Sequence, residues 1–142
     1  MNNKEKKYEK LTILRESESK YPESPDEAKL ETFENSYGDR DYWITFECPE
    51  FTSRCPITNQ PDFGQINIRY MPDKRCIESK SLKLYLFSYR NYRTFHEEVV
   101  NKILDDIVSV CQPRRVMVSG DFNPRGGISI KVEAEYNLKE NG

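Results

Sequence analysis

Residues 94–122 read TFHEEVVNKILDDIVSVCQPRRVMVSGDF, and the spacing of the apolar residues changes once along them. In the first part they recur at steps of three and four, which predicts an amphipathic helix that begins at Thr94 and ends before Pro113. Beyond Pro113 they alternate with polar residues, which predicts a half-buried strand. The helical residues are Val99, Val100, Ile103, Leu104, Ile107, Val108 and Cys111, and the strand residues are Val116, Val118, Gly120 and Phe122.

The same two periods predict the neighbouring elements. Downstream, Ile128 to Tyr136 alternates as another strand, and residues 123–127 connect the two strands as a hairpin loop. Upstream, the dense apolar stretch from Ser79 to Tyr89 predicts a helix that is buried on most sides, with its exit at residues 91–93. The chain from residue 79 onward therefore follows the order ααββ.

Two further strands are predicted before the helices. Residues 65–71 alternate polar and apolar side chains, and residues 42–46 are rich in aromatic and β-branched side chains. The loop from Cys48 to Phe63 separates them, because its three prolines interrupt both ladders and helices. The order ββααββ predicts an α+β fold, with an antiparallel sheet and two helices on one face.

The 142 residues allow one domain. We expect this domain to span residues 29–142, because residues 1–28 contain a single small apolar cluster and predict a mobile polar arm. Hydrophobic residues make up 36% and charged residues 32% of the chain, so the core is thin for a monomer.

Charge and cysteine content exclude several classes of function. The net charge of −2 gives no general attraction to nucleic acid or to anionic membranes. The sequence contains neither a hydrophobic membrane span nor a signal peptide, so we expect a cytoplasmic protein with four free thiols. With one histidine and no Cys-x-x-Cys pair, a zinc site is not expected.

Four motifs carry a resemblance to a known family. Residues 51–56 read FTSRCP and are followed by QPDF at 60–63, residues 78–85 read ESKSLKLY, residues 95–97 read FHE, and residues 124–127 read PRGG. From about Leu30 to about Tyr136 the chain resembles the NADPH-dependent 7-cyano-7-deazaguanine reductases of queuosine biosynthesis, in their short single-module form. The resemblance implies the tunnelling fold (T-fold), in which ββααββ subunits close into rings, two rings stack, and the active sites lie between subunits.

The resemblance also implies a reaction and its two central residues. The substrate is a 7-deazaguanine whose nitrile becomes a primary amine, NADPH is the co-substrate and no metal is required. Cys55 is implied as the nucleophile that adds to the nitrile and forms a thioimide. Asp62 is implied as the group that transfers the proton. Without the motif, Cys55 would be interpreted as a small buried side chain and Asp62 as a turn residue.

The resemblance implies a substrate site at Ile77, Glu78, Ser79, His96 and Glu97. A carboxylate at Glu97 suits the ring N–H and the exocyclic amine of a guanine-like edge, which are two parallel donors. Each assignment has a structural alternative. Glu97 has the spacing of a capping box that starts at Thr94, and Ser79 has the position of a helix N-cap.

The cofactor must be bound without a Rossmann domain, because no Gly-x-Gly-x-x-Gly motif follows a predicted strand. Lys80 and Lys83 are three residues apart on the predicted helix and, with Arg125, are the candidates for binding the NADPH phosphates. The alternative is that the lysines are solvated on an exposed face.

Two other functions remain as alternatives to the reductase. One is a pterin- or guanosine-processing enzyme of the same fold, which would need a zinc site that a single histidine does not supply. The other is a non-catalytic RNA-binding module that uses the aromatic and basic residues between Tyr85 and Phe95. The second alternative leaves Cys55, Asp62 and Glu97 without a role.

Overall fold

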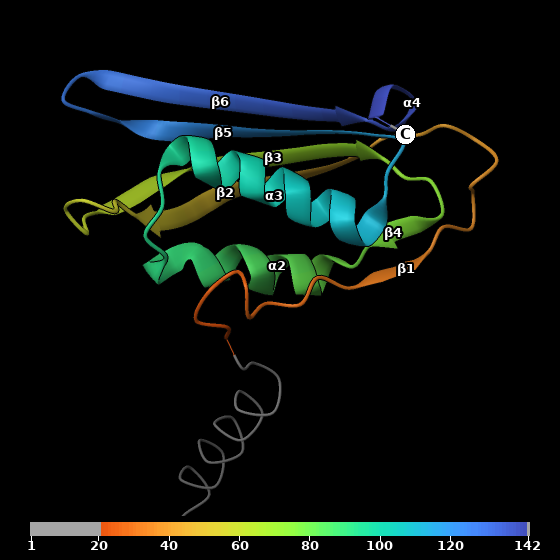
Figure 1. The fold of residues 1–142 in the computed structure, drawn as a ribbon, viewed down its shortest axis with the longest axis horizontal. Helices are drawn as coiled ribbons and strands as arrows, with labels where there is room; N and C mark the ends of the chain where they lie inside the picture. The colour runs from red at the N-terminus through yellow and green to blue at the C-terminus, as the bar shows by residue number, and fades with distance from the viewer. Residues whose placement is uncertain (1–20, 142) are drawn as a thin grey trace, which may run out of the picture.

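A four-stranded antiparallel sheet forms the centre of the computed structural model, which describes residues 21–141. Its strands lie in the order β2-β3-β5-β6 (Figure 1). The strands are β2 (Ile44–Arg54), β3 (Pro61–Met71), β5 (Arg115–Arg125) and β6 (Ile128–Asn137). β2 and β6 are therefore the two edges of this sheet.

Two helices cover one face of the sheet (Figure 1). α2 (Ser79–Phe87) continues into a short 3-10 helix, η1 (Ser88–Asn91), and α3 (His96–Cys111) follows. The apolar side of α3 packs on β5 and β6, and the predicted stripe is buried, apart from a partly buried Val108. The fully buried side chains include Val99, Val100, Ile103 and Ile107 from α3 and Ile66, Ile68, Val116 and Val118 from the sheet. The predicted order and the placement of both helices on one face are confirmed.

The predicted loop from Cys48 to Phe63 is wrong at both ends. β2 continues to Arg54 and β3 begins at Pro61, which leaves only residues 55–60 as the connection. Pro49 is tolerated because β2 is an edge strand and its pairing with β3 shifts between Cys48 and Phe51. Pro61 is the first residue of its strand, a position that also tolerates proline.

The β5–β6 hairpin also differs from the prediction. β5 extends to Arg125, and the loop consists of Gly126 and Gly127 alone. Both glycines have positive φ angles, 56° and 78°, as tight two-residue hairpin loops require. Pro124 lies where the pairing with β6 shifts, between Phe122 and Arg125. The strand therefore accommodates this proline at an irregularity, as β2 does.

The sequence did not predict three short elements. β1 (Thr32–Glu34) and β4 (Arg75–Ile77) form a small antiparallel sheet of their own, and α4 (Leu138–Asn141) ends the described chain. Each has three or four residues, which is too short for a period to be recognised.

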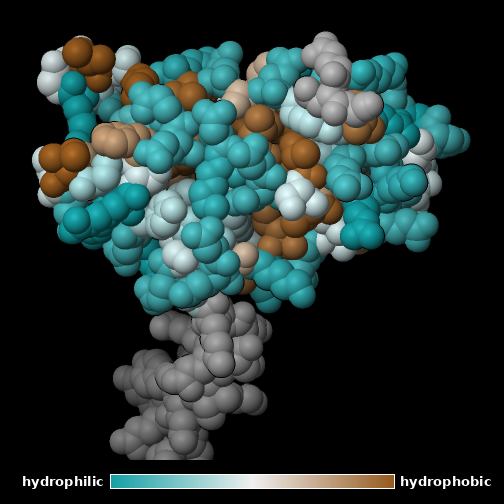
Figure 2. Space-filling model, viewed as in Figure 1, coloured by the Kyte–Doolittle hydropathy of each residue, from teal (hydrophilic) through white to brown (hydrophobic). Residues whose placement is uncertain are grey.

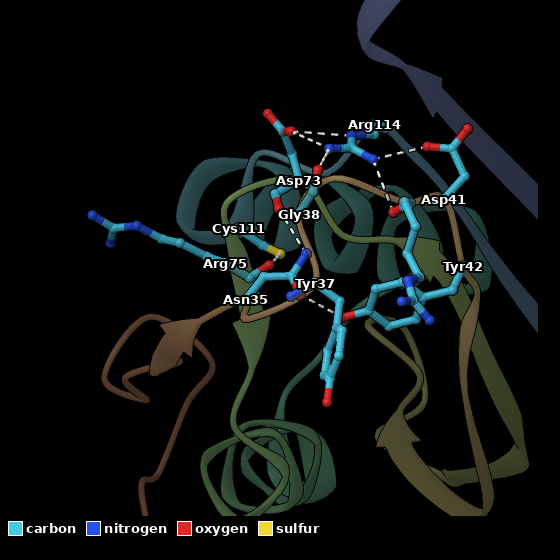
Figure 3. A network of polar contacts seen from close by, with 10 residues as sticks. Asn35, Tyr37, Gly38, Asp41, Tyr42, Asp73, Arg75, Cys111 and Arg114 are labelled. Atoms are coloured by element: carbon cyan, nitrogen blue, oxygen red, sulfur yellow. Dashed lines mark hydrogen bonds and ion pairs between the residues drawn. The ribbon is translucent and has the colours of Figure 1, made fainter.

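Arg114 binds residues of the connection between β1 and β2 through ion pairs and hydrogen bonds (Figure 3). Its guanidinium lies 2.8 Å from the Asp41 carboxylate and 3.0 Å from that of Asp73, and it also donates to the Gly38 carbonyl. Asn35 accepts from the Tyr42 hydroxyl at 2.6 Å. This network fixes residues 35–42 against the end of β3 and the start of β5.

Residues 1–20 of the predicted arm lie outside the described residues, so its mobility stays a prediction. The part that is described contacts the helices. Asp26 forms an ion pair with Lys102 of α3 at 2.9 Å, and the Pro22 carbonyl accepts from Arg90 of η1. The Tyr21 ring packs on Phe87, with 4.7 Å between centroids.

The two most exposed of the large apolar side chains lie at one end of the molecule. Ile57 in the β2–β3 connection is 79% exposed and Ile128 at the start of β6 is 74% exposed. Phe63 and Phe95, from the starts of β3 and α3, are also exposed. Figure 2 shows apolar surface where the two hairpins end and in the middle of the helical face. Within residues 21–141, no helix has the length and hydrophobicity of a membrane span.

Candidate active site

Cys55 lies in the tight connection between β2 and β3. Its N–H donates to the Gln60 carbonyl at 2.9 Å, and its own carbonyl accepts from the N–H of Asn59 at 3.0 Å. Asn59 adopts a positive φ of 60°, which asparagine tolerates better than most residues. The six-residue connection is therefore closed by its own backbone, and the Cys55 side chain is half-buried.

The connection stabilises the thiolate of Cys55. Hydrogen bonds from the Thr58 hydroxyl and from the N–H groups of Thr58 and Ile57 lower the pKa of Cys55 from 9.0 to about 7. A smaller repulsion from Asp62 acts in the opposite direction. By contrast, burial raises the pKa of Cys48, and it raises that of Cys111 to about 12. Cys55 is therefore suited to act as a nucleophile near neutral pH.

Asp62 is the second residue of β3 and is directly paired with Ser53 of β2. Its side chain is only 8% exposed. One carboxylate oxygen, Oδ1, lies 2.8 Å from Nε of Arg125, and the other, Oδ2, lies 3.4 Å from Nε2 of His96. The Thr52 hydroxyl donates to the Asp62 backbone carbonyl at 2.9 Å. The end of β5 and the start of α3, which are distant from Asp62 in the sequence, thus both contact its carboxylate.

His96 is the first residue of α3, and its ring stacks on Phe122 of β5. The two centroids are 4.0 Å apart and the planes are 4° from parallel. Nε2 of His96 is buried and has no hydrogen-bond partner in the described part of the chain. The stacking fixes the ring so that this nitrogen faces Asp62.

The predicted capping box of Thr94 and Glu97 is wrong by one residue. The N-cap is Phe95, and the carboxylate of Glu98 accepts from the Phe95 N–H at 3.3 Å. Within residues 21–141, the exposed Glu97 side chain forms no hydrogen bond or ion pair. Its carboxylate, in the first turn of α3, is therefore free to bind a ligand.

Glu78, and not Ser79, is the N-cap of α2. Its carboxylate accepts from the N–H groups of Lys80 and Ser81 at 2.8 and 2.7 Å, and these bonds lower the pKa of Glu78. The neighbouring Ile77 is buried, and its N–H donates to the hydroxyl of Tyr70 at 2.9 Å. Ser79 is exposed.

The structure divides the predicted site residues into two groups. Cys55, Asp62, His96, Glu97 and Arg125 lie at the end where the two hairpins and the start of α3 meet (Figure 1). The other predicted residues lie in β4, at the N-cap of α2 or in α2 itself, and the start of this helix is at the opposite end (Figure 1): Ile77, Glu78, Ser79, Lys80 and Lys83. One chain does not bring the two groups together.

Comparison with known proteins shows the family of this chain. Residues 61–141 match the family model described as QueF-like protein. An NADPH-dependent 7-cyano-7-deazaguanine reductase of Streptococcus mutans is 55% identical over 126 residues, which cover 89% of this chain and 78% of that protein. This chain belongs to the QueF-like family. A reductase of the same name from Porphyromonas gingivalis is 54% identical over 128 residues, covering 90% of this chain and 83% of the relative.

A solved structure of the QueF-like family supports the fold. The crystal structure of the archaeosine synthase QueF-Like in the apo form superposes with a TM-score of 0.62 over 68% of this chain and 93% of that one. The sequence identity is 23%, so this likeness concerns the fold alone. The predicted T-fold subunit is confirmed.

The QueF-like chain also has site features that the sequence did not predict. Arg54 and Arg93 both donate to Asn59 and hold the Cys55 connection from two sides, at 3.0 Å to its carbonyl and 3.2 Å to its side chain. A short parallel bridge joins residues 54 and 93. Since this contact depends on how the chain after η1 returns to β2, no local sequence signal indicates it.

The three candidate residues for binding the cofactor phosphates differ in the partners that their charges already have. Lys80 is exposed, and Lys83 lines a groove between α2 and β2. Between residues 21 and 141, the lysines that form ion pairs are Lys102 and Lys131, which leaves both candidates available for anions. Arg125 instead forms its ion pair with Asp62. No group of three or more His, Cys, Asp or Glu side chains in this range has a metal-binding arrangement.

Replacing Thr58 by Val should make Cys55 less reactive at neutral pH. The change removes the hydroxyl that contributes most to lowering the Cys55 pKa, so the pKa rises above 7 and the thiolate forms at higher pH. A rise of one unit would reduce the thiolate at pH 7 roughly five-fold. The measurement is the pH dependence of iodoacetamide labelling of the Cys55 peptide. Thr45→Val, at an exposed position near the other end of β2, serves as the control. An unchanged midpoint in Thr58→Val would contradict this role.

Proposed function

We propose that this chain reduces the nitrile of 7-cyano-7-deazaguanine to a primary amine, with NADPH as hydride donor, in queuosine biosynthesis. The observation that carries the proposal is the lowered pKa of Cys55 on the same hairpin as the buried carboxylate of Asp62. The reductase names of relatives 54–55% identical support the substrate and the cofactor. Free thiols at all four cysteines suit a cytoplasmic location, where thiols stay reduced.

The first step is the addition of the Cys55 thiol across the nitrile. A bond forms between Sγ and the nitrile carbon, one C–N π bond breaks, and the nitrogen gains the proton that the thiol loses. We propose that Asp62 carries this proton, and the burial of its carboxylate and its electrostatic interaction with Cys55 support this role. The product is a thioimide, and no electrons leave or enter in this step.

The later steps need hydride and further protons. Two NADPH molecules, bound one after the other, would each supply one of the two hydrides that convert a C≡N group into CH2–NH2 and would leave as NADP+. Cys55 leaves as the thiol after the first reduction, and Asp62 delivers protons to the nitrogen. His96, whose Nε2 lies 3.4 Å from the Asp62 carboxylate, is the next group in the proposed proton path. The imine between the two reductions must be kept from water, which requires that the site be closed.

Glu97 binds the guanine-like edge of the substrate in this proposal. Its carboxylate forms no hydrogen bond or ion pair within residues 21–141, since Glu98 takes the capping position. It lies in the first turn of α3, where free backbone N–H groups and the helix dipole favour a negative charge. The exposed Phe95 beside it has a flat ring suited to covering the heterocycle.

The second group of residues completes the site from a neighbouring subunit. We propose that Ile77, Glu78 and Ser79 of one copy border the substrate at Cys55 of another, and that Lys80 and Lys83 bind the cofactor phosphates there. The separation of the two groups within one chain supports this arrangement (Figure 1).

The sheet edges support assembly into rings. β2 and β6 are edge strands of 11 and 10 residues, long enough to pair with another chain. The four strands alternate in direction, so β6 of one copy and β2 of the next would pair antiparallel without a break. We propose that such pairing closes a ring and that two rings stack.

An apolar groove beside β2 adds to this interface. It has a volume of about 380 Å³ and lies between the edge strand and α2. Its lining includes Phe46, Cys48, Phe51, Leu82, Leu86 and Phe87. Because pairing at β2 would place the next copy directly over this groove, we propose a second copy of this chain as its occupant.

Replacing Cys55 by Ala should abolish the covalent adduct and the turnover. Wild-type protein incubated with the nitrile alone should gain the full mass of the nitrile, whereas Cys55→Ala should not. NADPH oxidation should fall by roughly three orders of magnitude or more. Mass spectrometry and nicotinamide absorbance provide the two measurements. Cys111→Ala is the control, because burial raises the pKa of that thiol to about 12. An adduct in Cys55→Ala would refute the assignment.

Replacing Glu97 by Gln should weaken substrate binding. A charge-assisted hydrogen bond contributes about 1.5–3 kcal/mol, so we expect roughly 10- to 100-fold weaker binding, measured by calorimetry with the nitrile. The matched variant is Glu98→Gln, which should lower the unfolding temperature and leave the affinity nearly unchanged, because Glu98 caps α3. A lower unfolding temperature with unchanged affinity in Glu97→Gln would assign the capping role to Glu97.

Two inactive variants should restore activity when they are co-expressed. Cys55→Ala impairs one half of the site, and Glu78→Ser impairs the other while serine keeps an N-cap on α2. If each site takes its halves from two subunits, random mixing makes roughly a quarter of the sites intact. NADPH oxidation by the purified mixture is the measurement. Absence of recovery would mean that both halves come from one subunit, and an active Glu78→Ser alone would remove Glu78 from the site.

A further inference from the structure

Arg125 contacts two consecutive residues at the start of β3. Its Nε lies 2.8 Å from Oδ1 of Asp62, and its Nη2 donates to the Pro61 carbonyl at 3.1 Å. The guanidinium therefore holds the Asp62 side chain and the backbone just before it at the same time. A single ammonium group cannot reproduce two such contacts in one plane.

The hairpin geometry places Arg125 at this position. Arg125 is the last residue of β5 and pairs with Ile128, immediately before the two-glycine loop. The pairing with β6 is irregular between Phe122 and Arg125, and such an irregularity changes the direction of the side chains that follow it. The contact thus depends on local features of this hairpin.

The Asp62 carboxylate needs this partner because it is almost completely buried. A buried carboxylate without a compensating donor is strongly destabilised. Apart from Arg125, the cation-forming side chain beside it is His96, on the other oxygen. Arg125 thus occupies Oδ1 and leaves Oδ2 directed to the buried Nε2 of His96, which has no hydrogen-bond partner within residues 21–141.

We propose that Arg125 is a positioning residue for Asp62 in the addition of Cys55 to the nitrile, and not a ligand of the cofactor phosphates. It holds Asp62 so that Oδ2 is the oxygen that carries the thiol proton to the nitrile nitrogen. Arg125 itself gives no proton and touches no reacting atom. This inference rests on the proposed function, since it concerns the step in which the Sγ–C bond forms.

An experiment without NADPH distinguishes a residue that positions Asp62 from a residue that binds the cofactor. Addition of the thiol to the nitrile requires no NADPH, so a residue that only binds the cofactor cannot affect its rate. The test is therefore the rate of adduct formation, followed by mass spectrometry with the nitrile alone, for wild type, Arg125→Ala and Arg125→Lys. A second series measures the KM for NADPH.

Arg125→Ala should form the adduct roughly 10- to 100-fold more slowly, since a small displacement of a catalytic group has an effect of this size. Arg125→Lys should be intermediate, because it keeps the charge and loses the second contact. Ethylguanidinium added to Arg125→Ala should restore part of the rate. Arg115→Ala is the control, since Arg115 lies on the same strand, exposed, with Glu135 as its partner at 3.5 Å. It should behave as wild type.

A wild-type rate of adduct formation in Arg125→Ala, together with a raised KM for NADPH, would overturn the inference and assign Arg125 to the cofactor. If Arg125→Ala does not fold, as judged by circular dichroism, Arg125→Lys decides in the same way. Absence of any adduct in the wild type contradicts the proposed function itself, so the two failures are distinguishable.

Discussion

The packing of α3 across β5 and β6 is the constraint on which the site depends. Gly120 makes this close approach possible, because a Cβ there would lie 2.8 Å from the Val100 side chain and 2.7 Å from the Phe122 ring. With the helix seated at this depth, its first residue, His96, stacks on Phe122 and its buried nitrogen reaches Asp62. A hydrophobic contact made for stability therefore determines the distance between two polar groups that the proposed chemistry uses.

The charges of the site are arranged before any substrate is present. Asp62 is buried against Arg125, and the Cys55 thiolate receives hydrogen bonds from the turn that contains it. Both arrangements are made by residues of the two hairpins. Such preorganisation suits a reaction in which a weak electrophile must meet a reactive sulfur and a proton donor at once.

Periodicity was sufficient for the sheet and the helices but not for their boundaries. Proline at position 49 predicted a loop, since one sequence does not show that β2 lies at an edge where proline is tolerated. A helix start displaced by one residue exchanged the roles of Glu97 and Glu98. The motifs pointed to Cys55 and Asp62 through resemblance. The partner of Arg125 was not predictable, because it depends on the irregular pairing of β5 with β6.

The low apolar content of the chain has a physical explanation in the proposed ring. Side chains such as Ile57 and Ile128 are exposed in one subunit at the same end as Cys55, and the groove beside β2 is open. Pairing of the sheet edges would cover the groove with a second copy, and we propose that a neighbouring copy also covers the Cys55 end and brings Glu78 there. The same contact would exclude water from the bound imine. In the proposed ring, the neighbouring copy would bury part of the apolar surface of each subunit and would supply part of its active site. A single subunit would therefore have a thin core and an incomplete site.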